Sequence, residues 1–231
     1  MKTLQKVGGI GALICAGTYI LALGLVAALL SPMLDSSLPY EQFMAFYLPH
    51  QSLVSLWHFS MYLVNGPFLA LLILALYQQL KTGAPALALA GACFGLFWTG
   101  LVFASGFISL YGWQTIDRLA LADPSQAKTL WLVVSTITNG IDTSDRFLGC
   151  LWVLLTSWAA LRSRQLARPL NVFGLVIGIA GIVSSLIPAL ASMGIAFGLG
   201  VIVWWIWLGV VLLGNRNPAV MPISEYRTTT P

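Results

Sequence analysis

Residues 161–190, LRSRQLARPLNVFGLVIGIAGIVSSLIPAL, decide the fold of this chain. Three arginines, Arg162, Arg164 and Arg168, precede a stretch from 170 to 190 that contains no charged residue. A helix of about 20 apolar residues spans the hydrocarbon core of a bilayer, which is roughly 30 Å thick. The stretch therefore predicts a transmembrane helix. Its basic end is expected in the cytosol, because loops rich in Lys and Arg stay on that side.

The composition of the whole chain indicates that lipid surrounds it. Only 8% of its 231 residues are charged, 58% are hydrophobic, and the mean hydropathy is +0.88. A soluble domain carries roughly a quarter of charged residues, so too few are present here to cover a water-exposed surface. The net charge of +4 does not indicate nucleic-acid binding, because the basic residues lie at the ends of apolar segments. The lipid bilayer is the expected partner.

Six segments predict transmembrane helices, which makes the expected fold an all-α, polytopic membrane bundle. They cover residues 7–30, 51–79, 84–111, 143–161, 170–190 and 195–213. With the N-terminus inside, this threading places most basic residues on the inner side: Lys2, Lys6, Lys81, Arg162, Arg164, Arg168, Arg216 and Arg227. A seventh span at 125–140 would move the three arginines outside. We therefore predict an extra interfacial or re-entrant helix at 125–140 on the outer face, ended by Asn139 and Gly140.

The remaining segments lie outside these spans. The first outer loop, 31–50, contains Pro32, Pro39 and Pro49 and predicts a short aromatic interfacial helix at 40–47. A single transmembrane domain is expected over 1–214. The polar tail, 215–231, is expected to be a disordered cytoplasmic segment.

A polar stripe follows one face of the second predicted span. Its members, spaced four, three, four and three residues apart, are Gln51, Ser55, His58, Tyr62 and Asn65. Polar side chains avoid lipid, so this face is expected to contact other helices or a wet cavity. Two interpretations stay open: interhelical hydrogen bonds, or a ligand or ion pocket open to the outer side. The Asn65-Gly66-Pro67 sequence predicts a kink.

A charged cluster opens the fourth predicted span and consists of Asp142, Asp145 and Arg146. Asp142 and Arg146 have the spacing of a helical ion pair, with the acid first, and acids in a first helical turn suit the helix dipole. A capping and ion-pair role is one interpretation. The other is a functional site, if the cluster meets the polar stripe and brings an acid to His58, which would make a proton-sensitive pair.

The sequence gives no support for a catalytic residue, a metal or a cofactor. His50 and His58 lie on one segment and cannot ligate a haem iron from opposite sides, and a zinc site would need distant acids. No nucleophile, phosphate-binding or dinucleotide motif occurs in a suitable context, so neither an enzyme nor intramembrane hydrolysis is expected. Gly91-xxx-Gly95, Gly174-xxx-Gly178 and Gly194-xxx-Gly198 permit close helix crossings, within the bundle or in a homo-oligomer.

Four stretches of this chain resemble a widespread family of small bacterial integral membrane proteins, classed only as a domain of unknown function. They are KVGGIGALICAGTYI from Lys6, LGCLWVLLTSWAAL from Leu148, LNVFGLVIGIAGIVSSLIPAL from Leu170 and GLGVIVWWIWLGVVLL from Gly198. The resemblance implies a six-helix membrane fold and a bacterial origin, but no activity. We therefore expect a multi-pass protein of the bacterial cytoplasmic (inner) membrane with both termini cytoplasmic.

Three functions are compatible with this pattern. The first is a non-enzymatic protein that binds a small amphipathic or lipid-like ligand in an outward-facing cavity lined by His58, Asn65 and the charged cluster. The second is a structural or accessory subunit whose polar stripe only packs helices. The third is a small proton-coupled transporter, for which His58 is the sole ionisable candidate within a span.

Overall fold

The computed structural model describes residues 2–34, 38–190 and 192–214. It contains α1 (Lys2–Leu25), α2 (Tyr40–His58), α3 (Asn65–Leu80), α4 (Pro85–Ala122), α5 (Pro124–Ser163), α6 (Arg168–Leu186) and α7 (Met193–Leu213). Short π-helical segments are η1 (Val26–Leu30) and η3 (Phe59–Val64); short 3-10 segments are η2 (Ser31–Leu34) and η4 (Pro188–Leu190). No strand occurs in the described residues, so the all-α prediction is confirmed. The predicted tail, 215–231, lies outside them.

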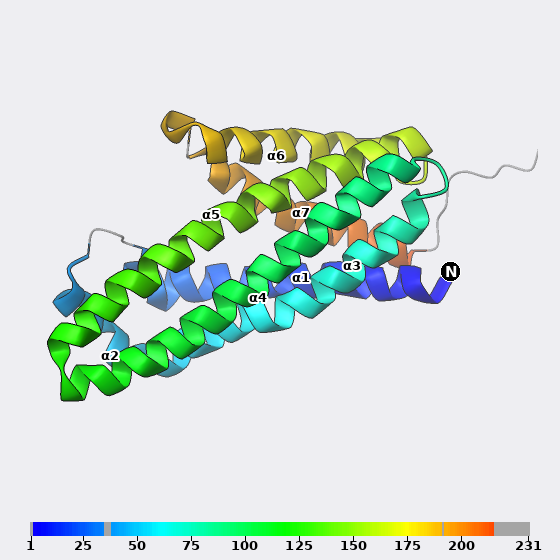
Figure 1. Cartoon of the computed structure of the whole chain (residues 1–231). Helices are drawn as coiled ribbons and strands as arrows, with labels where there is room; N and C mark the ends of the chain where they lie inside the picture. Colours follow the sequence, from blue (N-terminus) through cyan, green and yellow to red (C-terminus); the bar gives the residue numbers. More distant parts are fainter. Residues whose placement is uncertain (1, 35–37, 191, 215–231) are drawn as a thin grey trace, which may run out of the picture.

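Five continuous helical stretches are long and apolar enough to cross a membrane, as in a multi-pass membrane protein. They are Thr3–Met33, Tyr40–Leu80, Pro85–Ala122, Arg168–Leu186 and Met193–Leu213. The helix α5, which contains the predicted fourth span, is not among them, because Asp145, Arg146 and its polar neighbours interrupt its apolar part. Figure 1 shows that α5 nevertheless runs alongside α4 and connects the same two ends of the bundle.

The predicted separate helix at 125–140 is wrong. Residues 124–163 form one uninterrupted helix, α5, and neither Asn139 nor Gly140 ends it. The side chain of Val134, one of the buried residues of α5, packs against Gly112 of α4. Glycine inside a helix costs about 1 kcal/mol relative to alanine, and packing along α4 outweighs such a cost.

The prediction of a separate interfacial helix at 40–47 is also wrong. Helix α2 begins at Tyr40, passes through Pro49 and ends at His58, so the aromatic segment 40–47 and the second span share one helical stretch. Buried Phe43, Tyr47 and Val54 hold both sides of the proline in place. The irregularity predicted at 65–67 occurs one turn earlier, as the π-helical η3. Pro67 has no backbone N–H to donate to Leu63, which lies in η3, and the widened turn accommodates this loss.

The predicted inner ends of the helices meet at one end of the bundle, which we call the basic end. Gln5 of α1 donates to the carbonyl of Leu212 in α7 at 3.1 Å, and Gln165 donates to Thr82 at 2.8 Å. Figure 1 shows the N-terminus, the α3–α4 turn and the α5–α6 turn side by side. The basic residues of these segments include Lys6, Lys81, Arg162, Arg164 and Arg168. The fold therefore places these cations at one end of the bundle, in agreement with the threading that assigned them to the inner side.

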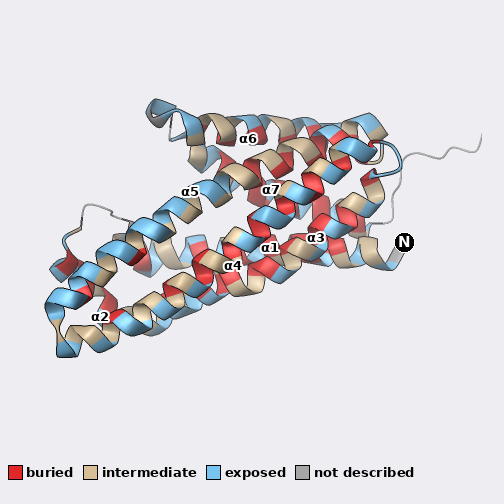
Figure 2. Cartoon of the chain, viewed as in Figure 1, coloured by how far each residue is buried: buried red, intermediate tan, exposed pale blue. Residues whose placement is uncertain are grey.

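A tryptophan core fills the middle of the bundle. It consists of Trp98, Trp152, Trp204 and Trp205, each at most 2% exposed. The faces of Trp98 and Trp205 stack at 6.0 Å, and Trp152 meets the edge of Trp204 at 5.6 Å. Figure 2 shows buried residues along α1, α3, α4 and α7 in this region. The core joins helices that lie far apart in the sequence.

Two of the three predicted glycine pairs pack within the chain. Gly91 and Gly95 face α5, and Gly174 and Gly178 face α5 from the opposite helix, α6. The third pair differs, because a Cβ at Gly198 would meet nothing within 4 Å. The first two close crossings therefore serve the bundle itself.

Three helical stretches are much longer than α6 and α7, namely Tyr40–Leu80, α4 and α5. At 1.5 Å per residue, the 40 residues of α5 extend about 60 Å, whereas the 19 residues of α6 extend about 28 Å. Figure 1 shows α4 and α5 continuing past the end of α6 toward α2. A second hydrophobic cluster, with Phe43, Tyr47, Ile116 and Ala127 at its centre, holds these extensions together.

Candidate functional site

The extended half of the bundle contains a cavity of about 420 Å³, which we call the large cavity. It lies between η1, α2, η3, α4 and α5. Its walls combine aromatic rings with polar groups: Phe43, Trp57, Trp113, Trp131, His58, Tyr62, Ser109, Asn139 and Asp142 are among the residues that line it. A volume of this size is typical of small-molecule sites, which pair apolar walls with a few polar groups.

A second cavity of about 220 Å³, which we call the lower cavity, lies on the side toward the tryptophan core. Tyr62 and Asp142 line both cavities and so form the wall between them. Asp145, Arg146 and Trp98 line the lower cavity only. The structure thus brings the polar stripe and the charged cluster together at one place.

His58 is fixed by its own helix. Its side chain is 5% exposed, and Nδ1 donates to the carbonyl of Val54 at 2.8 Å. In the neutral ring, Nε2 is then the acceptor. The ring stacks on Tyr62 with 5.9 Å between centroids and lines the large cavity. No hydrogen bond between His58 and an acid is formed among the described residues; the predicted proton-sensitive pair is therefore not in direct contact.

Asp142 accepts hydrogen bonds from two hydroxyl groups. Ser105 of α4 donates at 2.5 Å, and the Tyr62 hydroxyl lies 3.4 Å from each carboxylate oxygen. The predicted ion pair with Arg146 is wrong, because no such contact within 4.0 Å exists. Arg146 instead lies at the lower cavity near Gly194, where the α6–α7 connection ends. The packing of α5 against α4 presents Asp142 to Ser105.

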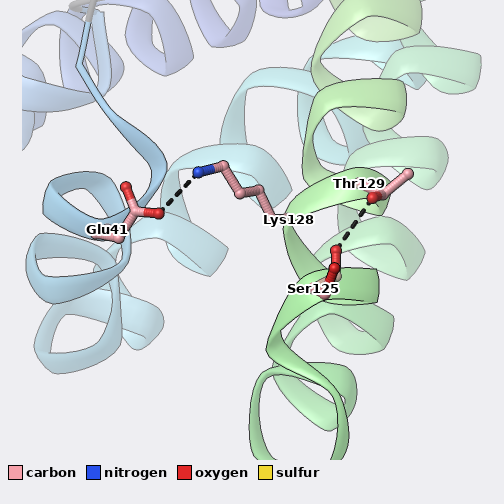
Figure 3. A network of polar contacts seen from close by, with 4 residues as sticks. All are labelled: Glu41, Ser125, Lys128 and Thr129. Atoms are coloured by element: carbon pink, nitrogen blue, oxygen red, sulfur yellow. Dashed lines mark hydrogen bonds and ion pairs between the residues drawn. The ribbon is translucent and has the colours of Figure 1, made fainter.

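One ion pair occurs among the described residues, far from Asp142. Lys128 of α5 lies 2.8 Å from Glu41 of α2, and Figure 3 shows the two side chains meeting across the gap between these helices. Both are largely exposed, so the pair contributes little to stability. It lies near the start of both helices, beside the aromatic contact of Tyr40 with Trp131.

The other members of the stripe divide between two roles. Gln51 and Ser55 line a smaller cavity of about 90 Å³, which His58 also lines. Asn65 lines none of the cavities described; it is 1% exposed and donates to the Thr18 hydroxyl at 2.8 Å. Asn65 therefore joins α3 to α1, which is the packing interpretation of the stripe.

Several lining residues were not predicted as site residues. Trp57 and Trp113 are tryptophans of apolar helices, and Trp131 lies in the segment assigned to a separate outer helix. Ser105 and Ser109, four residues apart in an otherwise apolar stretch, mark one face of α4 and are a signal that the sequence does contain. Among the residues that were not predicted, only this serine pair has a helical spacing that the sequence itself shows.

The described residues contain no candidate metal site and one further cavity, away from the predicted site residues. No group of three or more His, Cys, Asp or Glu side chains in them is placed to hold a metal ion. A cavity of about 300 Å³ lies at the basic end, lined largely by neutral amides, and contains no predicted site residue.

The chain belongs to a family described as a domain of unknown function (DUF4386), whose model matches residues 9–213. The resemblance noted in the sequence is thereby confirmed. The comparisons with curated proteins and with solved structures find no match.

Proposed function

We propose that this multi-pass membrane protein binds a small amphipathic ligand in the large cavity, without catalysing a reaction. The observation that carries the proposal is the cavity of about 420 Å³ whose aromatic walls enclose His58 and Asp142. An apolar body would contact the rings, and a polar end would meet these two groups. Because Tyr62 and Asp142 line both cavities, a longer ligand would reach the lower cavity beside them.

Two polar groups of the cavity walls support a ligand rather than packing. The indole nitrogen of Trp57 is buried and has no hydrogen-bond partner among the described residues. The Nε2 atom of His58 is an acceptor in a ring that faces the cavity. Buried polar groups usually have partners, and a ligand or bound water would satisfy both. The contrast with the packing role is clearest for His58, because Asn65 on the same stripe donates to Thr18, whereas Nε2 of His58 has no partner among the described residues.

We propose further that the basic end faces the cytoplasm of a bacterial cell and that the large cavity lies on the outer side. The positive-inside rule supports this orientation, because Lys6, Lys81, Arg162, Arg164 and Arg168 gather at the basic end. The helices α6 and α7 have the length of a hydrocarbon core and end near Arg146. The large cavity would then lie at and beyond the outer interface.

A cavity-filling substitution tests the proposal. The probe is N-phenyl-1-naphthylamine, a neutral amphiphile that fluoresces in apolar surroundings, added to the protein in lipid nanodiscs. Ser109 is 4% exposed and lines the large cavity, so Ser109→Leu should reduce its volume and weaken the saturable fluorescence above that of empty nanodiscs. Thr115→Leu, on the exposed face of α4, should leave it unchanged. Equal binding by both variants contradicts the proposal.

The two histidines provide a second, matched pair. His50 and His58 both donate Nδ1 to the carbonyl four residues earlier at 2.8 Å, but only His58 lines a cavity described here. We expect His58→Ala to weaken probe binding several-fold and to reduce the probe-dependent rise in melting temperature, and His50→Ala to do neither. Complete absence of saturable binding by the wild-type protein would instead favour the accessory role.

A further inference from the structure

Aromatic rings form part of the walls of the large cavity, beside polar side chains that include Ser135, Thr136 and Thr138. Phe43, Trp57, Trp113 and Trp131 come from α2, α4 and α5 and line it together. Phe43 stacks on Trp113 with centroids 5.3 Å apart and contacts Trp131 at 5.6 Å, so these rings form one connected group. The faces of indole rings carry negative electrostatic potential and attract cations.

Asp142 is the one charged residue among the described residues that line the large cavity. Its contacts are the neutral hydroxyls of Ser105 and Tyr62, and none of the described lysines or arginines pairs with it within 4.0 Å. A partly buried carboxylate without a counter-ion attracts a cation more strongly than a fully exposed carboxylate does. It also repels an anion.

The lower cavity also contains carboxyl groups. Asp142 and Asp145 line it together with one cation, Arg146. Arg146 is exposed at the rim near Gly194, whereas both acids are partly buried. An anionic ligand would therefore meet a carboxylate in either cavity.

We infer that the ligand of the large cavity is an organic cation, an amine or quaternary ammonium group on an apolar body, held by the aromatic walls and Asp142. This inference rests on the proposed function and adds the chemical class of its ligand. The apolar body would lie among Phe43, Trp113 and Trp131, with the charge close to Asp142. Recognition of quaternary ammonium groups by aromatic faces is a known use of these side chains.

The test compares two probes that differ only in charge. Benzyltrimethylammonium carries the cation, and neopentylbenzene replaces its nitrogen by carbon. Each competes with N-phenyl-1-naphthylamine for the protein in nanodiscs. We expect the cation to displace the dye at about one tenth of the concentration that its carbon isostere needs. Benzenesulfonate, an anion of similar size, should not displace the dye.

The carboxylate is tested by Asp142→Asn, which removes the charge and preserves the shape. We expect it to weaken the cation about tenfold and to leave neopentylbenzene unchanged. The matched control is Asp123→Asn, because Asp123 caps the same helix through the backbone amides of Ser125 and Gln126 and lies outside the cavities described. Asparagine caps helices as well as aspartate does.

The aromatic wall is tested by Trp113→Leu, which keeps an apolar side chain but removes the ring. Cation displacement should weaken more than displacement by the isostere, whereas Trp158→Leu, at an exposed site of α5, should change neither. Equal potency of the two probes on the wild type, or an unchanged cation affinity in Asp142→Asn, overturns the inference. Absence of saturable dye binding overturns the proposed function as well, so the two failures are distinguishable.

Discussion

The tryptophan core and the large cavity are built from the same kind of side chain, yet one is filled and the other is hollow. Trp98, Trp152 and Trp205 are at most 2% exposed, whereas Trp57, Trp113 and Trp131 are only partly buried and line a cavity of about 420 Å³. The number of tryptophans therefore does not decide which region is densely packed.

The number of helices around each region explains the difference. At the level of the tryptophan core, α1, α3, α4, α5, α6 and α7 surround a common axis, and glycines let them approach closely. Beyond the ends of α6 and α7, the walls come from α2, α4, α5 and the end of the first helical stretch (Figure 1). Fewer helices surround the tryptophans of this region than surround those of the core, so space remains between the side chains.

The largest expected effect comes from truncating one tryptophan in each region. Trp152→Ala removes a ring that is 1% exposed and touches Trp98 and Trp204, so we expect it to lower the free energy of unfolding by about 3 kcal/mol. Trp113→Ala removes a partly buried ring with open space on one side, so we expect about 1 kcal/mol. Titration with SDS from bicelles, followed by far-UV circular dichroism, measures both.

The exposed Trp158 provides the control for this comparison. It lies on α5 with Trp152 but is 44% exposed, so Trp158→Ala should change stability least. Equal losses for Trp152→Ala and Trp113→Ala would mean that the cavity half is packed as firmly as the core. The contrast between the two regions would then be wrong.

An intermediate effect is expected from glycines on one helix. A Cβ at Gly95 would lie 2.6 Å from Cδ1 of Trp152 and 2.9 Å from Ile73, and both side chains are 1% exposed. Gly95→Ala should therefore destabilise the protein by about 2 kcal/mol through overpacking. Gly100→Ala, where a Cβ would meet nothing within 4 Å, should stabilise it by up to about 1 kcal/mol.

The sign of these two changes, measured by the same SDS titration, decides the prediction. Stabilisation by Gly95→Ala would show that α4 and α5 are not in close contact in the core. A decrease in the free energy of unfolding for Gly100→Ala would show that this position is covered, for example by a second copy of the chain. Neither result fits the packing described here.

The sequence predicted the class of fold and the gathering of cations, because hydropathy and charge act through the bilayer and need no knowledge of packing. It failed at helix ends. Pro49 and Gly140 disfavour a helix locally, but each lies in a helix whose neighbouring residues are held by contacts with other helices. The local costs, about 1 kcal/mol for glycine and about 3 kcal/mol for proline, do not outweigh such contacts.

The candidate site was only partly predictable for a related reason. Periodicity placed His58 and Tyr62 on one face, and both line the large cavity. It could not show that Ser105 of α4 would face Asp142, because the depth and rotation of two helices decide that contact. The same limit explains why Asn65, on the same stripe, contacts Thr18 and not a cavity.

The smallest expected effect tests the continuity of the wall itself. Gly140 lies within α5 beside Asn139, which lines the large cavity, and a Cβ there would meet nothing within 4 Å. Gly140→Ala should therefore raise the free energy of unfolding by about 0.5–1 kcal/mol, the gain expected inside a helix. If a helix instead ended here, with the glycine in the left-handed conformation, alanine would be strained and the substitution would destabilise. The SDS titration distinguishes the two signs. A decrease in the free energy of unfolding would indicate that α5 is interrupted at Gly140. Residues 125–140, which form part of one wall of the large cavity, would then belong to a different helix from Asp142.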